Sequence, residues 1–85
     1  MRRNRLEEYL DLIRIIAQTG PVELTAISYQ AKMETEKLNS HIEFLVNQGL
    51  VEKRGSKKLQ TFVATTRSYK ILKFFDKEIV QFKTN

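Results

Sequence analysis

The sequence predicts one mainly helical domain with a small β-hairpin, in the order helix, helix, helix, strand, strand, helix. Three observations predict this fold class. Apolar residues recur at spacings of three and four in four separate segments, which is the period of a helix. Two short segments with partial alternation flank a Gly-Ser-Lys-Lys sequence, which is typical of a hairpin. The chain has 85 residues, so residues 1–85 are expected to build a single core.

The first helix is expected over residues 4–18. Its inward face comprises Leu6, Tyr9, Leu10, Ile13, Ile16 and Ala17. Asn4 and Glu7 have the spacing of a capping box, in which each side chain bonds the backbone of the other residue. Gly20-Pro21 is expected to end the helix, with Gly20 in the left-handed conformation. A shorter second helix is expected from Leu24 to Lys32, and it buries Leu24, Ile27 and Ala31.

Thr35 is the expected N-cap of a third helix, and Gly49 is its expected stop. Its inward stripe consists of Leu38, Ile42 and Leu45. The strands are expected over residues 50–54 and 59–64, and Val51 and Phe62 are candidates to pack the hairpin on the helices. Either Thr65 or Thr66 is expected to cap the last helix. This order is the winged helix-turn-helix arrangement, whose third helix enters the major groove while the hairpin lies along phosphates.

The charge of the chain favours a polyanionic partner. Its formal net charge is +5 and its pI is about 9.7. The excess lies in the second half, since residues 49–66 carry four basic residues against one acidic residue. Membrane spans and secretion signals are not expected, because Glu7, Glu8, Asp11 and Arg14 interrupt the first apolar segment. The absence of cysteine fits a reducing compartment. We therefore expect a cytoplasmic, nucleoid-associated protein.

Two segments carry a family resemblance. Residues 33–51 (METEKLNSHIEFLVNQGLV) and 61–72 (TFVATTRSYKIL) resemble the archaeal winged helix-turn-helix DNA-binding proteins of about ten kilodaltons. The resemblance covers residues 5–75 and implies a winged-helix core over residues 4–64. It also implies that residues 65–85 form a helix through which two copies pair. Ser68 stands where the family usually has glycine, and the last helix is shorter than in members with a long coiled coil.

Two groups of residues are the candidates for binding double-stranded DNA. On the third helix, asparagine can pair with adenine, lysine with guanine or phosphate, and glutamate with cytosine. In the hairpin, four cations lie within six positions and can contact phosphates, although such charges also prevent aggregation of strand edges. The helix candidates are Thr35, Glu36, Lys37, Asn39 and Ser40, and the hairpin candidates are Lys53, Arg54, Lys57 and Lys58.

No residue pattern points to catalysis, a cofactor, a metal or a small-molecule ligand. The chain has one histidine and no cysteine, which is too few ligands for a tetrahedral metal site. His41 is instead expected at the edge of the core, packed or hydrogen-bonded. Nucleophile–base pairs and glycine-rich phosphate loops are missing from the sequence. Glu7 and Glu8 are most simply solvated, as are Asp76 and Glu78. We expect a protein that is not an enzyme.

The last helix is expected to be the interface of a homodimer. Leu72, Phe75, Ile79 and Phe82 have the spacing of a helix seam. Ile71, Phe74 and Val80 widen this apolar surface beyond what one small core is expected to hide. The geometry of the dimer stays open.

Three functions are compatible with these observations. The first is a sequence-specific transcriptional regulator, which the acidic residues on the third helix favour. The second is an architectural chromatin-type binder with low sequence specificity. The third is a winged-helix protein-interaction module, whose last helix docks a larger partner. The operator sequence, the effector and the direction of regulation stay open.

Overall fold

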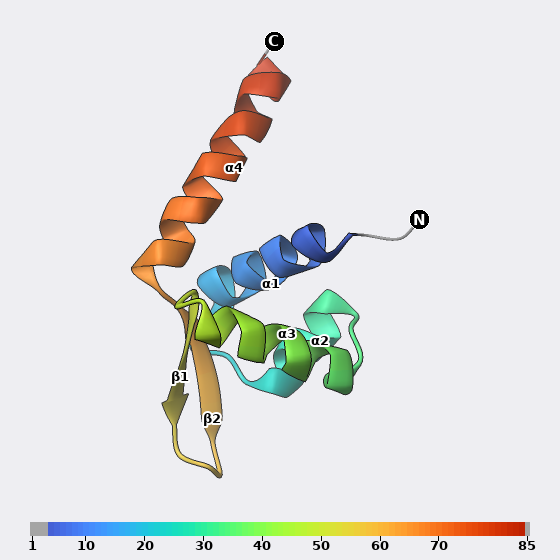
Figure 1. Cartoon of the computed structure of the whole chain (residues 1–85), viewed down its shortest axis with the longest axis vertical. Helices are drawn as coiled ribbons and strands as arrows, with labels where there is room; N and C mark the ends of the chain where they lie inside the picture. The colour runs from blue at the N-terminus through green and yellow to red at the C-terminus, as the bar shows by residue number, and fades with distance from the viewer. Residues whose placement is uncertain (1–3, 85) are drawn as a thin grey trace.

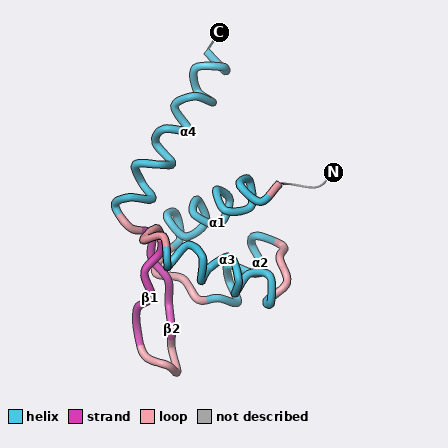
Figure 2. The backbone as a smooth tube through the Cα atoms, in the orientation of Figure 1, coloured by secondary structure: helices cyan, strands magenta, loops and turns pink. Residues whose placement is uncertain are grey.

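The computed structural model describes the backbone of residues 4–84 and the side chains of residues 4–75. Its elements are α1 (Arg5–Thr19), α2 (Leu24–Ala31), α3 (Thr35–Asn47), β1 (Val51–Gly55), β2 (Gln60–Ala64) and α4 (Thr66–Thr84). The predicted order is confirmed, and Figure 1 shows the hairpin and α4 extending in opposite directions from the three packed helices. The two strands lie side by side in Figure 2 and pair antiparallel. Their register runs from Val51 opposite Ala64 to Gly55 opposite Gln60.

Helix α1 begins as predicted and ends differently. The Asn4 side chain accepts from the Glu7 N–H at 2.8 Å, and the Glu7 carboxylate accepts from the Asn4 N–H at 3.1 Å. The left-handed conformation predicted for Gly20 is wrong, because its φ is −66°. Glycine is required there for space: a Cβ would lie 2.6 Å from the Ile16 carbonyl oxygen and 3.0 Å from that of Phe62.

A backbone bridge ties the segment before α2 to the hairpin. Val22 donates to the Phe62 carbonyl at 3.1 Å, and Phe62 donates to the Val22 carbonyl at 2.9 Å. The two side chains are also buried. The backbone of Gly20 therefore lies close to that of Phe62 because the neighbouring Val22 is bonded to Phe62. This contact fixes the position of the hairpin relative to the helices.

Helix α3 starts one residue earlier than predicted and stops as predicted. Glu34 occupies the N-cap position with no side-chain capping bond, and Thr35 is the first helical residue, so the predicted Thr35 cap is wrong. At the other end Gly49 has a φ of 74°. Leu50 donates to the Leu45 carbonyl at 2.9 Å and Gly49 to that of Val46 at 3.0 Å. These two bonds complete a Schellman motif, which satisfies carbonyls that the helix end leaves unpaired.

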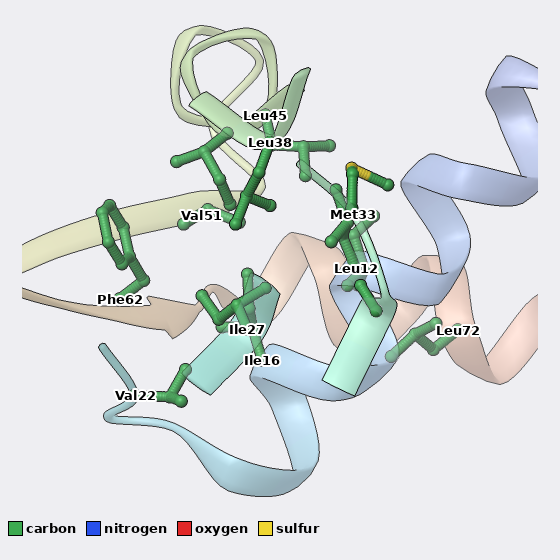
Figure 3. Packing of buried hydrophobic residues seen from close by; sticks show 13 residues of the cluster. Leu12, Ile16, Val22, Ile27, Met33, Leu38, Leu45, Val51, Phe62 and Leu72 are labelled. Carbon is green, nitrogen blue, oxygen red and sulfur yellow. The ribbon is translucent and has the colours of Figure 1, made fainter. Parts of the chain in front are cut away.

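One hydrophobic core joins all six elements. Leu38, Ile42 and Leu45 of α3 are buried as predicted, and Val51 and Phe62 pack the hairpin onto the helices. Figure 3 shows this packing from close by. The members of the core are Leu12, Ile13, Ile16, Val22, Ile27, Ala31, Met33, Leu38, Ile42, Leu45, Val51, Phe62 and Leu72.

The inward face of α1 is rotated from the predicted one. Leu6, predicted to face the core, is 54% exposed, whereas Leu12 is fully buried. Glu8, predicted to be solvated, is buried as well. The periodicity marked a broad apolar stripe, but α2 and α3 cover the side of α1 that carries Glu8 and Leu12. Leu24 of α2 is half-buried rather than buried.

Helix α4 is anchored by its first turn. The Thr65 hydroxyl accepts from the Ser68 N–H at 3.4 Å and donates to the Gly49 carbonyl at 2.7 Å. Ser68 is fully buried, and its hydroxyl donates to the Leu50 carbonyl. A glycine at this position could not supply that donor. The far end of α4 extends away from the body of the domain (Figure 1). Within the described residues, we find no helix with the length and apolar character needed to cross a membrane.

The rotated face of α1 gives the first testable prediction. Leu12→Ala removes a fully buried side chain and leaves a cavity, so it should lower the free energy of unfolding by about 2–5 kcal/mol. Leu59→Ala removes the same atoms from a side chain that is 58% exposed, and it should change stability by no more than about 0.5 kcal/mol. Urea unfolding followed by circular dichroism measures both variants. Equal losses would contradict the described packing of α1.

Candidate nucleic-acid interface

The outward face of α3 is polar and accessible. Because Leu38, His41, Ile42 and Leu45 are buried, the positions on the opposite side of the helix face solvent. Every residue predicted to lie on this face is exposed, namely Thr35, Glu36, Lys37, Asn39 and Ser40. The structure thus leaves the amide, hydroxyl and carboxylate groups of this helix available for hydrogen bonds, whereas the Lys37 ammonium turns toward α1.

The hairpin carries its four cations into solvent. Lys53, Arg54, Lys57 and Lys58 are all exposed, and Gly55, with a φ of 89°, begins the turn that brings the last two to the tip. A Cβ at Gly55 would also collide with the Leu59 carbonyl oxygen. The turn therefore depends on glycine for both its conformation and its space.

An ion pair shows that the hairpin and α3 share one side of the molecule. The Lys53 ammonium of β1 lies 2.6 Å from the Glu43 carboxylate of α3. Both side chains are substantially exposed, at 39% and 57%. An exposed pair of this kind is weak, worth at most about 1 kcal/mol. Lys53 can therefore exchange its carboxylate for a phosphate at little cost.

The other three cations of the hairpin fall into two groups. The Arg54 guanidinium lies 2.9 Å from the Glu52 carboxylate, again between exposed side chains. For Lys57 and Lys58 no ion pair or hydrogen bond is recorded within residues 4–75. The two lysines at the tip are thus the hairpin cations that an incoming anion can reach without displacing a carboxylate.

Lys37 has a partner that the sequence did not indicate. Its ammonium lies 2.7 Å from one carboxylate oxygen of Glu8 in α1, and the other oxygen lies 3.0 Å from Nε2 of His41. Lys37 and His41 are four residues apart, so they point from the same side of α3 toward α1. Glu8 bridges the two and ties the candidate recognition helix to α1.

Aromatic rings extend the same contact. Tyr9 meets His41 edge to face with ring centroids 4.7 Å apart, and it stacks on Phe44 at 4.6 Å. His41 is buried, which confirms that it is a packed and hydrogen-bonded residue at the edge of the core. The two helices are therefore held together by a polar bridge and a small aromatic cluster side by side.

The environment of Glu8 favours its charged form. Hydrogen bonds from Lys37, and then from His41, lower the pKa of the carboxyl from 4.5 to about 2, against the opposing effect of burial. At neutral pH Glu8 is therefore a carboxylate with both oxygens occupied. Lys37 keeps half of its side chain exposed, but its charge is largely neutralised within the domain.

Sequence reasoning missed Glu8 because it treated the two glutamates at positions 7 and 8 alike. A signal was available, since Glu8 lies one helical turn before Leu12 and two before Ile15 and Ile16. A carboxylate on that side of α1 needs a donor from a neighbouring helix. Lys37 and His41, four residues apart in the third helix, are the pair that supplies it.

A compact three-helix body with an exposed third helix and a basic hairpin beside it defines a small winged helix. The winged helix-turn-helix family model matches residues 2–81, so the chain belongs to that family. No curated protein matches the sequence.

Solved structures with the same fold include several regulators. Staphylococcus aureus MarR in complex with salicylate and kanamycin is 17% identical, with a TM-score of 0.80 over 92% of this chain and 53% of its own. Streptococcus pneumoniae FabT in complex with DNA is 18% identical, with a TM-score of 0.74 over 94% of this chain and 63% of its own. A MarR family regulator from Silicibacter pomeroyi is 21% identical, with a TM-score of 0.79 over 89% and 52%. This chain thus spans between 52% and 63% of the length of these proteins.

The Glu8 bridge predicts a dependence of stability on pH. Because the pKa of Glu8 is lowered in the folded protein, its stabilising effect is complete above about pH 4.5 and is lost as the pH falls toward about 2. Glu8→Gln should therefore lower the melting temperature at pH 7 and bring it closer to that of the wild type near pH 2. Thermal unfolding followed by circular dichroism between pH 2 and 7 measures the difference.

Glu36→Gln is the matched control, since it makes the same change on an exposed residue of α3. Its difference from the wild type should vary much less with pH. A Glu8→Gln curve that runs parallel to the wild-type curve over the whole range would contradict the described bridge.

Proposed function

We propose that this protein is a double-stranded DNA-binding regulator of transcription, with α3 in the major groove and the hairpin on the flanking phosphates. One observation carries the proposal: the polar face of α3 and the cationic hairpin lie on the same side of the domain, joined by the pair of Lys53 and Glu43. A helix can then enter the groove while the cations follow the backbone. The fold shared with FabT, whose structure is in complex with DNA, supports this arrangement.

The proposal assigns different tasks to the candidate residues. Asn39 and Ser40 are exposed on α3 and have no recorded partner within the described side chains, so they are free to bond base edges. Thr35 and Glu36 lie at the same end of the helix. Lys37 is already bonded to Glu8, and its contribution to binding should be smaller than its charge implies.

We also propose that the protein acts as a homodimer through α4, which places two copies of α3 for two half-sites about one turn of DNA apart. The first members of the predicted seam differ in their surroundings: Leu72 is buried in the core of its own domain, and Phe75 is half-buried at its edge. The side chains of Ile79 and Phe82 lie outside the described residues. The course of α4 away from the body supports a role in pairing (Figure 1).

The tip of the hairpin gives a test of phosphate contact. Replacing Lys57 and Lys58 with alanine should weaken binding to all duplexes alike. It should also flatten the slope of log K against log salt by about 0.9 per lost phosphate contact, hence by nearly two units. Fluorescence anisotropy with a labelled duplex at several salt concentrations measures the slope.

A charge-matched control is the pair Lys70→Ala and Lys73→Ala, two exposed lysines on α4. The control variant should keep a slope close to that of the wild type. If both variants lose the same slope, binding follows the net charge and not the hairpin.

The exposed face of α3 gives a test of base recognition. Asn39→Ala or Ser40→Ala should change the preference among sequences, at about 1–3 kcal/mol for each lost base contact, while binding to random duplex stays nearly unchanged. Selection from a random duplex library, followed by competition binding, measures this. Failure of the wild type to enrich any motif would replace the sequence-specific regulator with an architectural binder of low specificity.

A further inference from the structure

Lys37 is the one lysine or arginine of α3, and its ammonium is turned toward α1, where it lies 2.7 Å from a carboxylate oxygen of Glu8. In Figure 1, α1 lies above α3 and the hairpin extends below it. An ammonium bonded to α1 is therefore drawn away from the tip of the hairpin. The side chain of Lys37 is still 51% exposed, so the bond to Glu8, and not burial, determines where its charge lies.

Released from Glu8, Lys37 could reach DNA beside the exposed face of α3. At 100° per residue it lies about 60° around the helix from Ser40. A lysine also carries its charge on a flexible stem, which can turn to either side. The contact that it would add is one to phosphate, which carries no sequence information. A free Lys37 would therefore strengthen the binding of every duplex.

The pair of Lys37 and Glu8 differs from the pair of Lys53 and Glu43 in the burial of the carboxylate. The Glu43 side chain is 57% exposed, so water can replace Lys53 when that lysine turns to a phosphate. The Glu8 side chain is 11% exposed, and a carboxylate with so little access to water depends on its protein donors. Moving Lys37 to a phosphate would leave Glu8 with His41 alone. Phosphate therefore competes for Lys53 far more readily than for Lys37.

The carboxylate of Glu8 has little freedom to follow Lys37 toward DNA. Its other oxygen lies 3.0 Å from Nε2 of His41. The His41 ring meets Tyr9 edge to face, and Tyr9 stacks on Phe44 of α3. These contacts fix the carboxylate between α1 and α3, so the position of Glu8 sets the position of the Lys37 ammonium.

We propose that Glu8 is a positioning residue for DNA binding, which holds the charge of Lys37 at α1 and so limits the affinity of α3 for DNA of any sequence. Glu8 acts without touching the DNA. The inference rests on the proposed DNA binding, and it adds a determinant that lies outside the recognition helix and the hairpin. Sequence-independent affinity then comes from the hairpin, and α3 presents to the groove the groups that bond base edges, Asn39 and Ser40 among them.

Glu8→Gln tests the proposal, because it removes the charge of the carboxylate and keeps its shape. Lys37 is then left with at most a neutral acceptor and can turn to a phosphate. We expect the affinity for a random-sequence duplex to rise about three- to tenfold at about 50 mM salt, and the slope of log K against log salt to steepen by about 0.9. The gain should shrink about threefold between about 50 and 200 mM salt. Fluorescence anisotropy measures both quantities. A variant that only loosened the packing of α1 on α3 would bind less tightly, without a steeper slope.

Glu7→Gln is the matched control. It makes the same change of net charge one residue earlier, on an exposed side chain that can still complete the capping box. Because Lys37 is bonded to Glu8 and not to Glu7, this control should change the affinity and the slope much less. Equal gains from the two variants would show that binding follows net charge, and would overturn the proposal.

The double variant Glu8→Gln with Lys37→Gln closes a cycle. The gain seen with Glu8→Gln should disappear in it, because the cation to be released is gone. A gain that survives the loss of Lys37 contradicts the proposal, and so does weaker binding by a folded Glu8→Gln protein.

Lys37→Gln alone keeps the proposal testable if circular dichroism shows that Glu8→Gln is unfolded. Since Lys37 is expected to contribute little in the wild type, its loss should leave the salt slope close to the wild-type value. Lys58→Gln, at the tip of the hairpin, should flatten the slope by about 0.9. If both variants flatten the slope equally, Lys37 contacts phosphate while bonded to Glu8, and the proposal is wrong.

The outcome can be separated from that of the proposed function. A wild type that binds no duplex refutes the proposed function, and this inference with it. A wild type that binds, together with a folded Glu8→Gln variant that binds no better, refutes the role of Glu8 and leaves the regulator standing.

Discussion

The burial of one face of α3 is the constraint on which the rest of this structure depends. Leu38, Ile42 and Leu45 need cover from α1, from α2 and from the hairpin, because α3 has no other means of removing them from water. Once that face is covered, the opposite face is committed to solvent. The polar surface of α3 is therefore a consequence of core packing, and its use in binding follows from where the core has placed it.

The Glu8 bridge adds direction to this packing. Apolar contacts alone would allow α3 to rotate slightly or slide against α1, since such contacts are not directional. A carboxylate whose two oxygens bond Lys37 and His41 at 2.7 and 3.0 Å allows little of this movement. As a consequence, Lys37, the one lysine or arginine of α3, is paired with Glu8 within the domain. Phosphate binding then falls mainly to the hairpin, and α3 is left with groups suited to hydrogen bonds.

The hairpin and α4 are also attached to the body by a few specific contacts. The hairpin is short, and a two-stranded sheet of this size is marginal alone. The backbone bridge from Val22 and the burial of Phe62 attach it to the body. Ser68 and Thr65 attach α4 by bonds to the carbonyls that follow α3. The end of α3, the first strand and the start of α4 are thus fixed at one junction.

Much of the local structure was determined by the sequence. The capping box at Asn4 and Glu7, the stop at Gly49 and the turn at Gly55 follow from a few neighbouring residues and their backbone preferences. The inward stripe of α3 follows from its period. The resemblance carried by residues 33–51 and 61–72 gave the family. The caps, the turn and the stripe depend on residues only a few positions apart in the sequence, which is why a single sequence predicts them.

The tertiary structure alone decided how far α1 is rotated, and hence that Glu8 and Leu12 are inside while Leu6 is outside. It also decided that Gly20 serves a close approach of two backbones rather than a left-handed turn. Each of these depends on atoms brought from more than twenty residues away. An apolar stripe wider than the surface that covers it can be buried at more than one rotation, and only the neighbouring helices select among them. For the same reason, the sequence could place Lys37 on the outer part of α3 but could not tell that its charge is held by α1.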